Sequence, residues 1–323
     1  MAGNQVARFA DVAMYHAAEA ERAEEGDGEA ALPRVTLVQM TRNPLGTMAA
    51  ASELYRGTVC PSPVVNRMVA EEWLHDMTRT RLQTPLEFVS LHFLLENVSR
   101  GFTHQLVRQR TAAYVQESMR FAVKDDAGWA VYMPPSIAEL PDGHPRRELW
   151  IQAVKNTGTV YAGLVNNGIP AEDARGLLPT NILTRVHYHT NLRNLLEHAG
   201  NRLCTQAQFE WRLVFQGIVN AIRGFPSRLS DADGGSREHS LQWQYDAIAD
   251  LFRPICYRTG KCEFMAATDR HCNIRERVNS FHDSGIPSAQ WDSTVFPAHV
   301  RINPAEWLLD PASARKAPNS DVR

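Results

Sequence analysis

The apolar period of residues 191–222 constrains the fold of this chain more than any other feature. In NLRNLLEHAGNRLCTQAQFEWRLVFQGIVNAI, apolar side chains recur three or four residues apart, which places them along one face of a helix. These positions are Leu192, Leu195, Leu196, Ala199, Leu203, Ala207 and Val214. We therefore predict one long helix that packs on a core along that face. Gly200 weakens such a helix by roughly 1 kcal/mol relative to alanine, so we expect close packing there.

Shorter patterns predict strands and further helices around this segment. RVTLVQM at 34–40 is expected to form a strand, and the dense apolar run TPLEFVSLHFLLENV at 84–98 a buried strand. VYMPPS at 131–136 is expected to form a strand that ends in a turn, and SDADGGSRE at 230–238 a loop. Ser99 can cap a helix that runs from about Arg100 to Arg110. The other expected helices cover residues 47–57, 64–81, 146–168 and 170–178.

Composition and charge exclude several classes of protein. Hydrophobic residues make up 44% of the 323 residues and charged residues 22%, as in an ordinary globular protein. A formal net charge of −2 gives no basis for bulk binding to nucleic acid or to a membrane surface. No stretch approaches the ~20 apolar residues that cross a bilayer, and the first residues do not resemble a secretory signal. Five cysteines, an odd number, suit a reducing compartment, so we expect a cytoplasmic protein.

One large domain is expected between two ends of different composition. Residues 1–33 are rich in alanine and glutamate and are interpreted as a variable N-terminal arm. Residues 34–311 are expected to form a single domain, and residues 312–323 a disordered tail. The chain has neither G-x-G-x-x-G nor G-x-x-x-x-G-K-[ST], and neither H-E-x-x-H nor G-x-S-x-G. If it binds a nucleotide or a flavin, it does so without the common phosphate-binding loops.

The stretch VRQRTAAYVQESMRF at 107–121 concentrates polar side chains that do not fit a simple solvated face. On a helix, His104 and Gln105 would share a face with Arg108, and Arg120 follows beyond a turn. Guanidinium groups suit phosphate, and a glutamine offers both a donor and an acceptor to the edge of a base. Two other interpretations stay open: an arginine-rich helix paired with surface carboxylates, and a nucleic-acid-binding helix, which the overall charge disfavours.

Polar residues also interrupt the long predicted helix. Asn191 and Arg202 are eleven residues apart, almost three turns, so they would share a face with about 16 Å between them. Arg202 lies among apolar residues, where an unpaired charge is costly. We expect it either to pair with Glu197 or Glu210 or to bind a ligand. The full polar set is Asn191, Arg193, Arg202 and Gln208.

Possible metal ligands occur together in CYRTGKCEFMAATDRHC, which contains Cys256, Cys262, His271 and Cys272. Structural zinc sites usually contain C-x₂₋₄-C pairs, whereas this segment has C-x₅-C followed by adjacent histidine and cysteine. We therefore favour buried thiols over zinc and assign no metal site. His187 and His189 have the spacing of a strand and lack a third ligand, so they are interpreted as packed or hydrogen-bonded histidines.

Together these motifs resemble the flavin-dependent thymidylate synthase family. Its signature is Arg-His-Arg, seven residues and then Ser, and this chain has Arg-Gln-Arg at 108–110, seven residues (111–117) and Ser118. Tyr114 and Arg120 stand at matching positions. The resemblance spans about residues 35–215 in order. Its other segments are TPLEF, YMPPS, ARGLLPTNILTR and NLRNLLEHAGNRLCTQAQFEWR.

The resemblance implies an α/β (α+β) fold, with a central twisted β-sheet and helices packed around it. It implies a methyltransferase that converts dUMP to dTMP with methylenetetrahydrofolate as the carbon donor, while NADPH reduces FAD. The family forms a homotetramer with active sites at subunit interfaces, and neither nucleic acid nor membrane is an implied partner. Residues 34–311 would then be one catalytic domain, whose segment 216–311 extends beyond the family core.

The resemblance also assigns individual residues. Arg202 would be catalytic, because a guanidinium that faces the uracil favours its ionised form and makes the 5-carbon nucleophilic. The residues that match dUMP contacts are Gln105, Arg108, Gln116, Glu117, Ser118, Arg120, Arg175 and Arg202, and of these Arg120 and Arg175 suit the phosphate. The residues that match FAD contacts are Thr84, Arg108, Gln109, Arg110, Gln116, Asn191, Arg193 and Glu197.

Several positions depart from the family pattern, mostly on the flavin side. Gln109 replaces the signature histidine, and Leu82 and Phe88 replace the two histidines that flank Thr-Pro. Glu197 stands where the family usually has Asn or His. These departures concern cofactor binding and reduction more than nucleotide binding. Two other hypotheses therefore stay open: flavin-dependent modification of another pyrimidine nucleotide, and a non-catalytic nucleotide-binding paralogue.

Overall fold

The computed structural model describes residues 33–60, 65–120, 130–138, 140–204, 207–230 and 235–256. All of these belong to one unit, Leu32–Arg323. The predicted N-terminal arm up to residue 32, the predicted tail at 312–323 and the part of the extension beyond residue 256 lie outside the described residues. The domain boundaries therefore stay predictions. No helix in the described ranges is long and apolar enough to cross a membrane.

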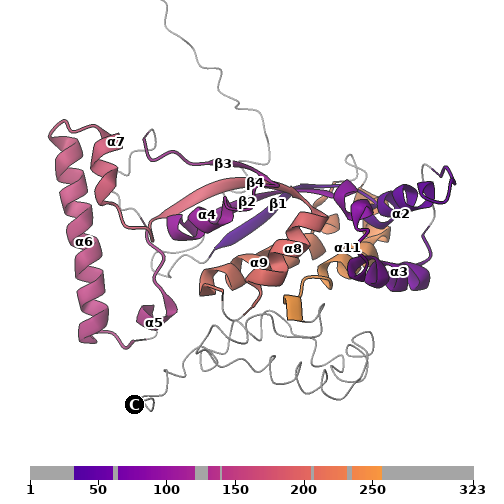
Figure 1. Cartoon of the computed structure of the whole chain (residues 1–323). Coiled ribbons are helices and arrows are strands. Elements are labelled where there is room, and N and C mark those ends of the chain that lie inside the picture. The colour runs from indigo at the N-terminus through magenta and orange to yellow at the C-terminus, as the bar shows by residue number, and fades with distance from the viewer. Residues whose placement is uncertain are drawn as a thin grey trace, which may run out of the picture. The chain divides into compact units, whose positions relative to one another are not determined.

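A four-stranded antiparallel sheet organises the described chain (Figure 1). Its order is β1 (Arg34–Met40), β2 (Ser90–Ser99), β4 (Leu183–Asn191) and β3 (Ala113–Gln116). The strand at 34–40, a buried strand within 84–98 and the α/β fold class are thereby confirmed. The inner strand β2 begins six residues later than predicted, at Ser90. Pro85 has no N–H for a sheet, and Thr84–Phe88 form the 3-10 helix η1 instead.

The helices follow the predicted order. Three local predictions are corrected: one strand, one loop and the end of one helix. The predicted strand at 131–136 is only an isolated bridge from Val131 to Ile182, because two prolines follow it and cannot donate to a ladder. The predicted loop at 230–238 contains the start of a helix at Gly235, and the helix after Ser99 ends at Leu106. The elements are α2 (Pro44–Leu54), α3 (Arg67–Arg79), α4 (Arg100–Leu106), α5 (Pro135–Ala138), α6 (Pro145–Asn166), α7 (Ala171–Ala174), η2 (Arg175–Leu177), η3 (Pro226–Arg228), α10 (Gly235–Ser240) and α11 (Gln242–Ala249).

The predicted long helix at 191–222 consists of two helices, α8 (Leu192–Arg202) and α9 (Phe209–Arg223). Gln208, with extended backbone, precedes α9 as its cap residue. Both helices carry their apolar residues in the register of one continuous helix, so the period could not reveal the break. A Cβ on Gly200 would lie 3.5 Å from the Cβ of Ile255, an ordinary contact, so close packing does not explain this glycine.

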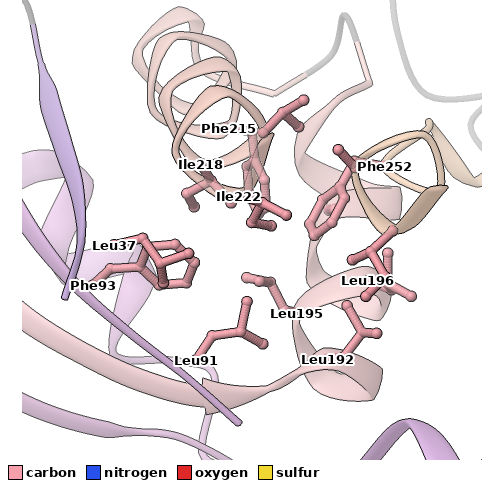
Figure 2. Close-up of a cluster of buried hydrophobic side chains, with 14 of the residues drawn as sticks. Leu37, Leu91, Phe93, Leu192, Leu195, Leu196, Phe215, Ile218, Ile222 and Phe252 are labelled. Atoms are coloured by element: carbon pink, nitrogen blue, oxygen red, sulfur yellow. The ribbon is translucent and has the colours of Figure 1, made fainter. Parts of the chain in front are cut away.

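The main core lies between the sheet and the helices α8 and α9 (Figure 2). Side chains alternate along β4, where Val186 and Tyr188 are buried while His187 and His189 are exposed on the opposite face. Figure 2 shows how side chains from β1, β2 and both helices meet. The labelled residues are Leu37, Leu91, Phe93, Leu192, Leu195, Leu196, Phe215, Ile218, Ile222 and Phe252.

Gly217 allows α9 to cross β1 closely, and a substitution there should be destabilising. A Cβ at this position would lie 2.5 Å from Cγ2 of Val35, a stiff β-branched side chain. We expect Gly217→Ala to lower the free energy of unfolding by about 1–3 kcal/mol through overpacking. Gly163→Ala on α6 is the matched control, because nothing lies within 4 Å of a Cβ there. The control should raise stability by up to about 1 kcal/mol. Equal effects in urea denaturation would contradict the close crossing.

Candidate active site

The helix α4 carries Gln105, the first residue predicted to bind dUMP, and is held at both ends. Ser99 caps its start as predicted, because Ser99 Oγ accepts from a backbone N–H of the first turn at 2.9 Å. Tyr114 closes its end, where its hydroxyl donates to the carbonyl of the last helical residue at 2.9 Å. Arg108 and Arg110 therefore lie beyond the helix in an exposed turn, and the expected helical face shared by Gln105 and Arg108 is not formed.

Gln105 joins three elements through its side-chain amide. Its Oε1 accepts from Nη1 of Arg202 at 3.1 Å and from Nε1 of Trp211 at 2.9 Å. Its Nε2 donates to Oε1 of Gln208 at 2.7 Å. The structure thus brings together Gln105 and Arg202, both assigned to dUMP by the resemblance. It adds Trp211, which the sequence analysis missed, although a buried indole N–H requires an acceptor and could have indicated the contact.

Arg202 lies half-buried at the end of α8 without the carboxylate partner that one interpretation proposed. Its Nε donates to Nε2 of His198 at 3.4 Å, and its Cζ lies 4.6 Å from the centre of the Trp211 ring. Glu210, one of the two expected partners, instead accepts from Ser99. Burial lowers the pKa of Arg202 from its very high ordinary value. The guanidinium keeps its charge, because arginine side chains are not deprotonated in proteins.

Gln109, which replaces the signature histidine, directs its amide into the protein. Its Nε2 donates to the carbonyl of Asn194 in the first turn of α8 at 3.1 Å, and its Oε1 accepts from the buried hydroxyl of Tyr188 at 2.6 Å. The rings of Tyr188 and Tyr114 stack 5.5 Å apart, and burial raises the pKa of Tyr114 to about 12. Gln109 therefore ties the Arg-Gln-Arg turn to β4 and α8.

Replacement of Gln109 by leucine should lower the free energy of unfolding by about 1–3 kcal/mol, because the buried Tyr188 hydroxyl would lose the amide oxygen that accepts from it and the Asn194 carbonyl would lose its donor. Equilibrium urea denaturation measures this effect. Tyr188→Phe in the Gln109→Leu background should recover most of the loss, since both partners are then apolar. A Gln109→Leu protein as stable as the wild type would show that the hydrogen bond to Tyr188 contributes nothing.

The residues predicted at the phosphate gather around α7. Nη2 of Arg120 pairs with Oε2 of Glu172 at 2.8 Å, and Nε of Arg175 donates to the carbonyl of Glu172 at 3.1 Å. Ser118 Oγ accepts from the backbone N–H of Arg120 at 3.3 Å. Arg100, which the sequence analysis missed, has its pKa lowered by burial and by the charge of Arg175. Several guanidinium groups thus lie near one another, with the carboxylates of Glu172 and Glu117 beside them.

The strand end at 116–117 joins this arginine group to α4. Nε2 of Gln116 donates to Oγ1 of Thr103 at 2.8 Å. The carbonyl of Glu117 accepts from Nη2 of Arg100 at 2.6 Å. Both predicted dUMP residues thus lie against α4, the helix that also carries Gln105.

Several of the residues predicted at FAD lie around the start of α8, whereas Gln116 contacts Thr103 of α4. Asn191 caps this helix by accepting from the N–H of Asn194 at 3.0 Å, and Arg193 forms an ion pair with Glu87 of η1, the helix that begins at Thr84. Asn191, Arg193 and Thr84 are thereby brought to one junction. Three other residues predicted at FAD are exposed: Arg108, Arg110 and Glu197. Leu82 and Phe88, which replace the two family histidines, are exposed as well.

The possible metal ligands are only partly described. Cys256 is partly buried, whereas Cys262, His271 and Cys272 lie outside the described residues. In the described part of the chain, no three His, Cys, Asp or Glu side chains are arranged to hold a metal ion. His187 Nδ1 lies 2.9 Å from Nε2 of His92, and Nε2 of His189 lies 2.7 Å from Oγ of Ser90. These contacts confirm the interpretation of His187 and His189 as hydrogen-bonded histidines.

Comparison with known proteins identifies the family. The family described as "Thymidylate synthase complementing protein" matches residues 36–226. The flavin-dependent thymidylate synthase of Pyrococcus abyssi is 33% identical over 245 residues, which cover 73% of this chain and 98% of the relative. The flavin-dependent thymidylate synthase of Geobacter sulfurreducens is 31% identical over 206 residues, which cover 62% of this chain and 88% of the relative.

The fold is also similar to a solved structure. A UMP/dUMP methylase, PolB from Streptomyces cacaoi, was crystallised with 5-Br dUMP and is 22% identical with a TM-score of 0.50. The similarity covers 58% of this chain and 89% of that structure, and it supports the α/β fold class. The match to more than half of the chain and the identity to the P. abyssi relative together show that this chain belongs to the flavin-dependent thymidylate synthase family.

Proposed function

We propose that this chain is a flavin-dependent thymidylate synthase that converts dUMP to dTMP, with methylenetetrahydrofolate as the carbon donor and NADPH as the reductant of FAD. The observation that carries the proposal is the 3.1 Å hydrogen bond between Arg202 and Gln105. These residues are 97 positions apart, and the resemblance assigns both to the same ligand. The names of the relatives and their near-complete coverage support the same activity.

Gln105 and Arg202 keep hydrogen-bond donors for a uracil ring. Both lone pairs of Gln105 Oε1 are occupied, and one of its two amide N–H groups binds Gln208, so the second can donate to a carbonyl of the base. Arg202 uses two of its five N–H donors on Gln105 and His198. Its other donors can stabilise negative charge on the ring oxygens. A charged guanidinium there favours the ionised uracil and makes the 5-carbon nucleophilic.

The phosphate of dUMP is proposed to bind Arg120 and Arg175, with the hydroxyl of Ser118. The bonds of both arginines to Glu172 hold them near each other, and Arg100 adds charge close to Arg175. Like charges that lie together favour an anionic ligand. Because Arg120 is paired with Glu172, a bound phosphate would compete with this carboxylate for the guanidinium.

The residues around the start of α8 fit FAD. Arg193 and the exposed Arg110 provide charge for a diphosphate, and Thr84 provides a hydroxyl. Leu82 and Phe88 are 58% and 56% exposed, so they offer apolar surface to a planar ring. Bound FAD would supply the reducing equivalents that turn the transferred methylene group into a methyl group. Gln109 would support this region through Asn194.

We also propose that the protein is a homotetramer and that it is cytoplasmic. The only buried residue among the 22 of α6 is Tyr161, and Leu149 and Val160 on this helix are 73% and 53% exposed. Val115 on the open face of the sheet is 72% exposed. Exposed apolar surface of this kind suits contacts between subunits. Light scattering after size-exclusion chromatography measures the assembly, and a monomer at micromolar concentration would contradict the tetramer.

Absorbance and product analysis of the purified protein test the activity. The protein is expected to be yellow or to become so with added FAD, and to release tritium from 5-tritiated dUMP when NADPH and methylenetetrahydrofolate are present. Protein that cannot be loaded with FAD would overturn the proposal. Product mass from a panel of pyrimidine nucleotides separates dUMP methylation from modification of another nucleotide. Binding of dUMP without flavin reduction would indicate the non-catalytic paralogue.

A further inference from the structure

Trp211 contacts both residues proposed for the uracil end of the site. It is the third residue of α9 and is 1% exposed. Its indole Nε1 donates to Oε1 of Gln105 at 2.9 Å, and its ring lies 4.6 Å below the guanidinium carbon of Arg202. A charged guanidinium over an indole face is attracted to the ring quadrupole. One rigid side chain therefore holds a glutamine from α4 and an arginine from α8.

The Trp211 ring is itself fixed by aromatic neighbours. Measured between ring centres, Phe102 lies 4.3 Å from Trp211 and Phe215 stacks on it at 6.0 Å. The ring of His198 packs edge to face with Trp211 at 4.8 Å. These contacts come from α4, α9 and α8. Because the indole is packed on several sides, it cannot rotate without disturbing the core. The indole N–H therefore points in a fixed direction and orients the Gln105 amide that accepts from it.

His198 also contacts Arg202. It lies one turn before Arg202 on α8, and its Nε2 is 3.4 Å from the arginine Nε. An arginine can only donate, so this contact requires an unprotonated Nε2, which places the proton of the neutral ring on the buried Nδ1, an atom without a hydrogen-bond partner among the described residues. Burial and the charge of Arg202 lower the pKa of His198 to about 4, which keeps the ring neutral near pH 7. His198 can thus accept from Arg202 without repelling it.

We infer that Trp211 and His198 are positioning residues, which fix the Gln105 amide and the Arg202 guanidinium in the geometry that binds the uracil of dUMP. This inference rests on the proposed function. Neither residue is expected to touch the substrate. Each limits the rotamers of a long side chain before the ligand arrives, which lowers the entropy lost on binding and aligns the donors.

Two variants of the full-length protein that keep an aromatic ring test the inference. Trp211→Phe keeps an aromatic ring but removes the N–H, and His198→Phe keeps a ring but removes the acceptor. We expect each to weaken dUMP binding, measured by calorimetry, by about tenfold, as for the loss of one hydrogen bond near 1–1.5 kcal/mol. Binding of FAD should change less than twofold. Phe225→Leu is the control, since Phe225 is also a buried aromatic residue and its ring packs on Tyr245. It should lower the melting temperature but leave dUMP affinity nearly unchanged.

A double-mutant cycle separates positioning from a purely structural role. If Trp211 acts through Gln105, Trp211→Phe should have no further effect on dUMP affinity in a Gln105→Ala background. An unchanged dUMP affinity in Trp211→Phe and His198→Phe, with normal losses in Gln105→Ala and Arg202→Ala, would overturn this inference alone. Unchanged dUMP affinity in Gln105→Ala and Arg202→Ala would overturn the proposed site together with the inference.

Discussion

Replacement of Arg202 by alanine should reduce the turnover of dUMP by at least about 100-fold, the cost of removing one donor that stabilises developing negative charge. The reason is local. Arg202 lies at the end of α8 and is hydrogen-bonded to Gln105 of α4. It also contacts His198 and Trp211. Without it, the negative charge of an ionised uracil would face uncharged groups. Tritium release from 5-tritiated dUMP measures the loss.

The fold should survive this substitution. Gln105 Oε1 keeps the Trp211 N–H as a donor, and the neutral His198 ring loses only a long 3.4 Å contact with the arginine, so the expected loss of stability is small. Arg223→Ala is the matched control, because Arg223 also lies in the last turn of a helix and pairs with Asp250 at 2.6 Å on the surface. It should retain normal turnover. Near-normal turnover by Arg202→Ala would show that the guanidinium does not act on the substrate.

Replacement of Glu210 by alanine should produce the largest loss of stability, about 2–5 kcal/mol, through two buried donors left without an acceptor. The carboxylate is fully buried and accepts from the N–H and from the hydroxyl of Ser99, both at 2.6 Å. Gln208 donates to it at 3.4 Å. Glu210 thus connects the start of α4 to the start of α9. Equilibrium urea denaturation gives the free energy of unfolding.

Glu210→Gln tests whether the charge matters in addition to the hydrogen bonds. It should lose less stability than the alanine variant, because the amide oxygen can still accept from Ser99. Burial raises the pKa of Glu210, so above the ordinary glutamate pKa of about 4.3 the folded protein binds more protons than the unfolded protein. The stability of the wild type should therefore fall relative to Glu210→Gln as the pH rises. A constant difference across the pH range would contradict a raised pKa.

Local sequence patterns predicted much of the fold, because strand periods and helix caps are set by residues that are close together in the sequence. The apolar run of β2 predicted an inner strand, and Ser99 predicted the start of α4 through its capping side chain. The same reasoning extended α4 to Arg110, since nothing nearby in the sequence shows that Tyr114 closes the helix at Leu106. It also joined α8 and α9 into one helix, because their apolar periods are in register.

The candidate site was predicted in its residue types and not in its contacts. The motifs around Arg108 and Arg202 pointed to a nucleotide and a flavin, and the family match supports that interpretation. Nothing in the sequence showed that the Gln109 amide would be engaged by Tyr188 and Asn194. That contact depends on strands and helices that pack from distant segments.

The sequence by itself determined the helical and strand periods, the cap of α4, the charge balance and the family. Each of these follows from composition, from residues close together in the sequence or from motifs in a fixed order. Only the tertiary structure decided that Gln105 and Arg202, which are 97 positions apart, bond to each other and that Trp211 contacts both. The physical reason is that a hydrogen bond acts over about 3 Å. Which side chains come that close depends on how α4, α8 and α9 pack, and no local pattern specifies it.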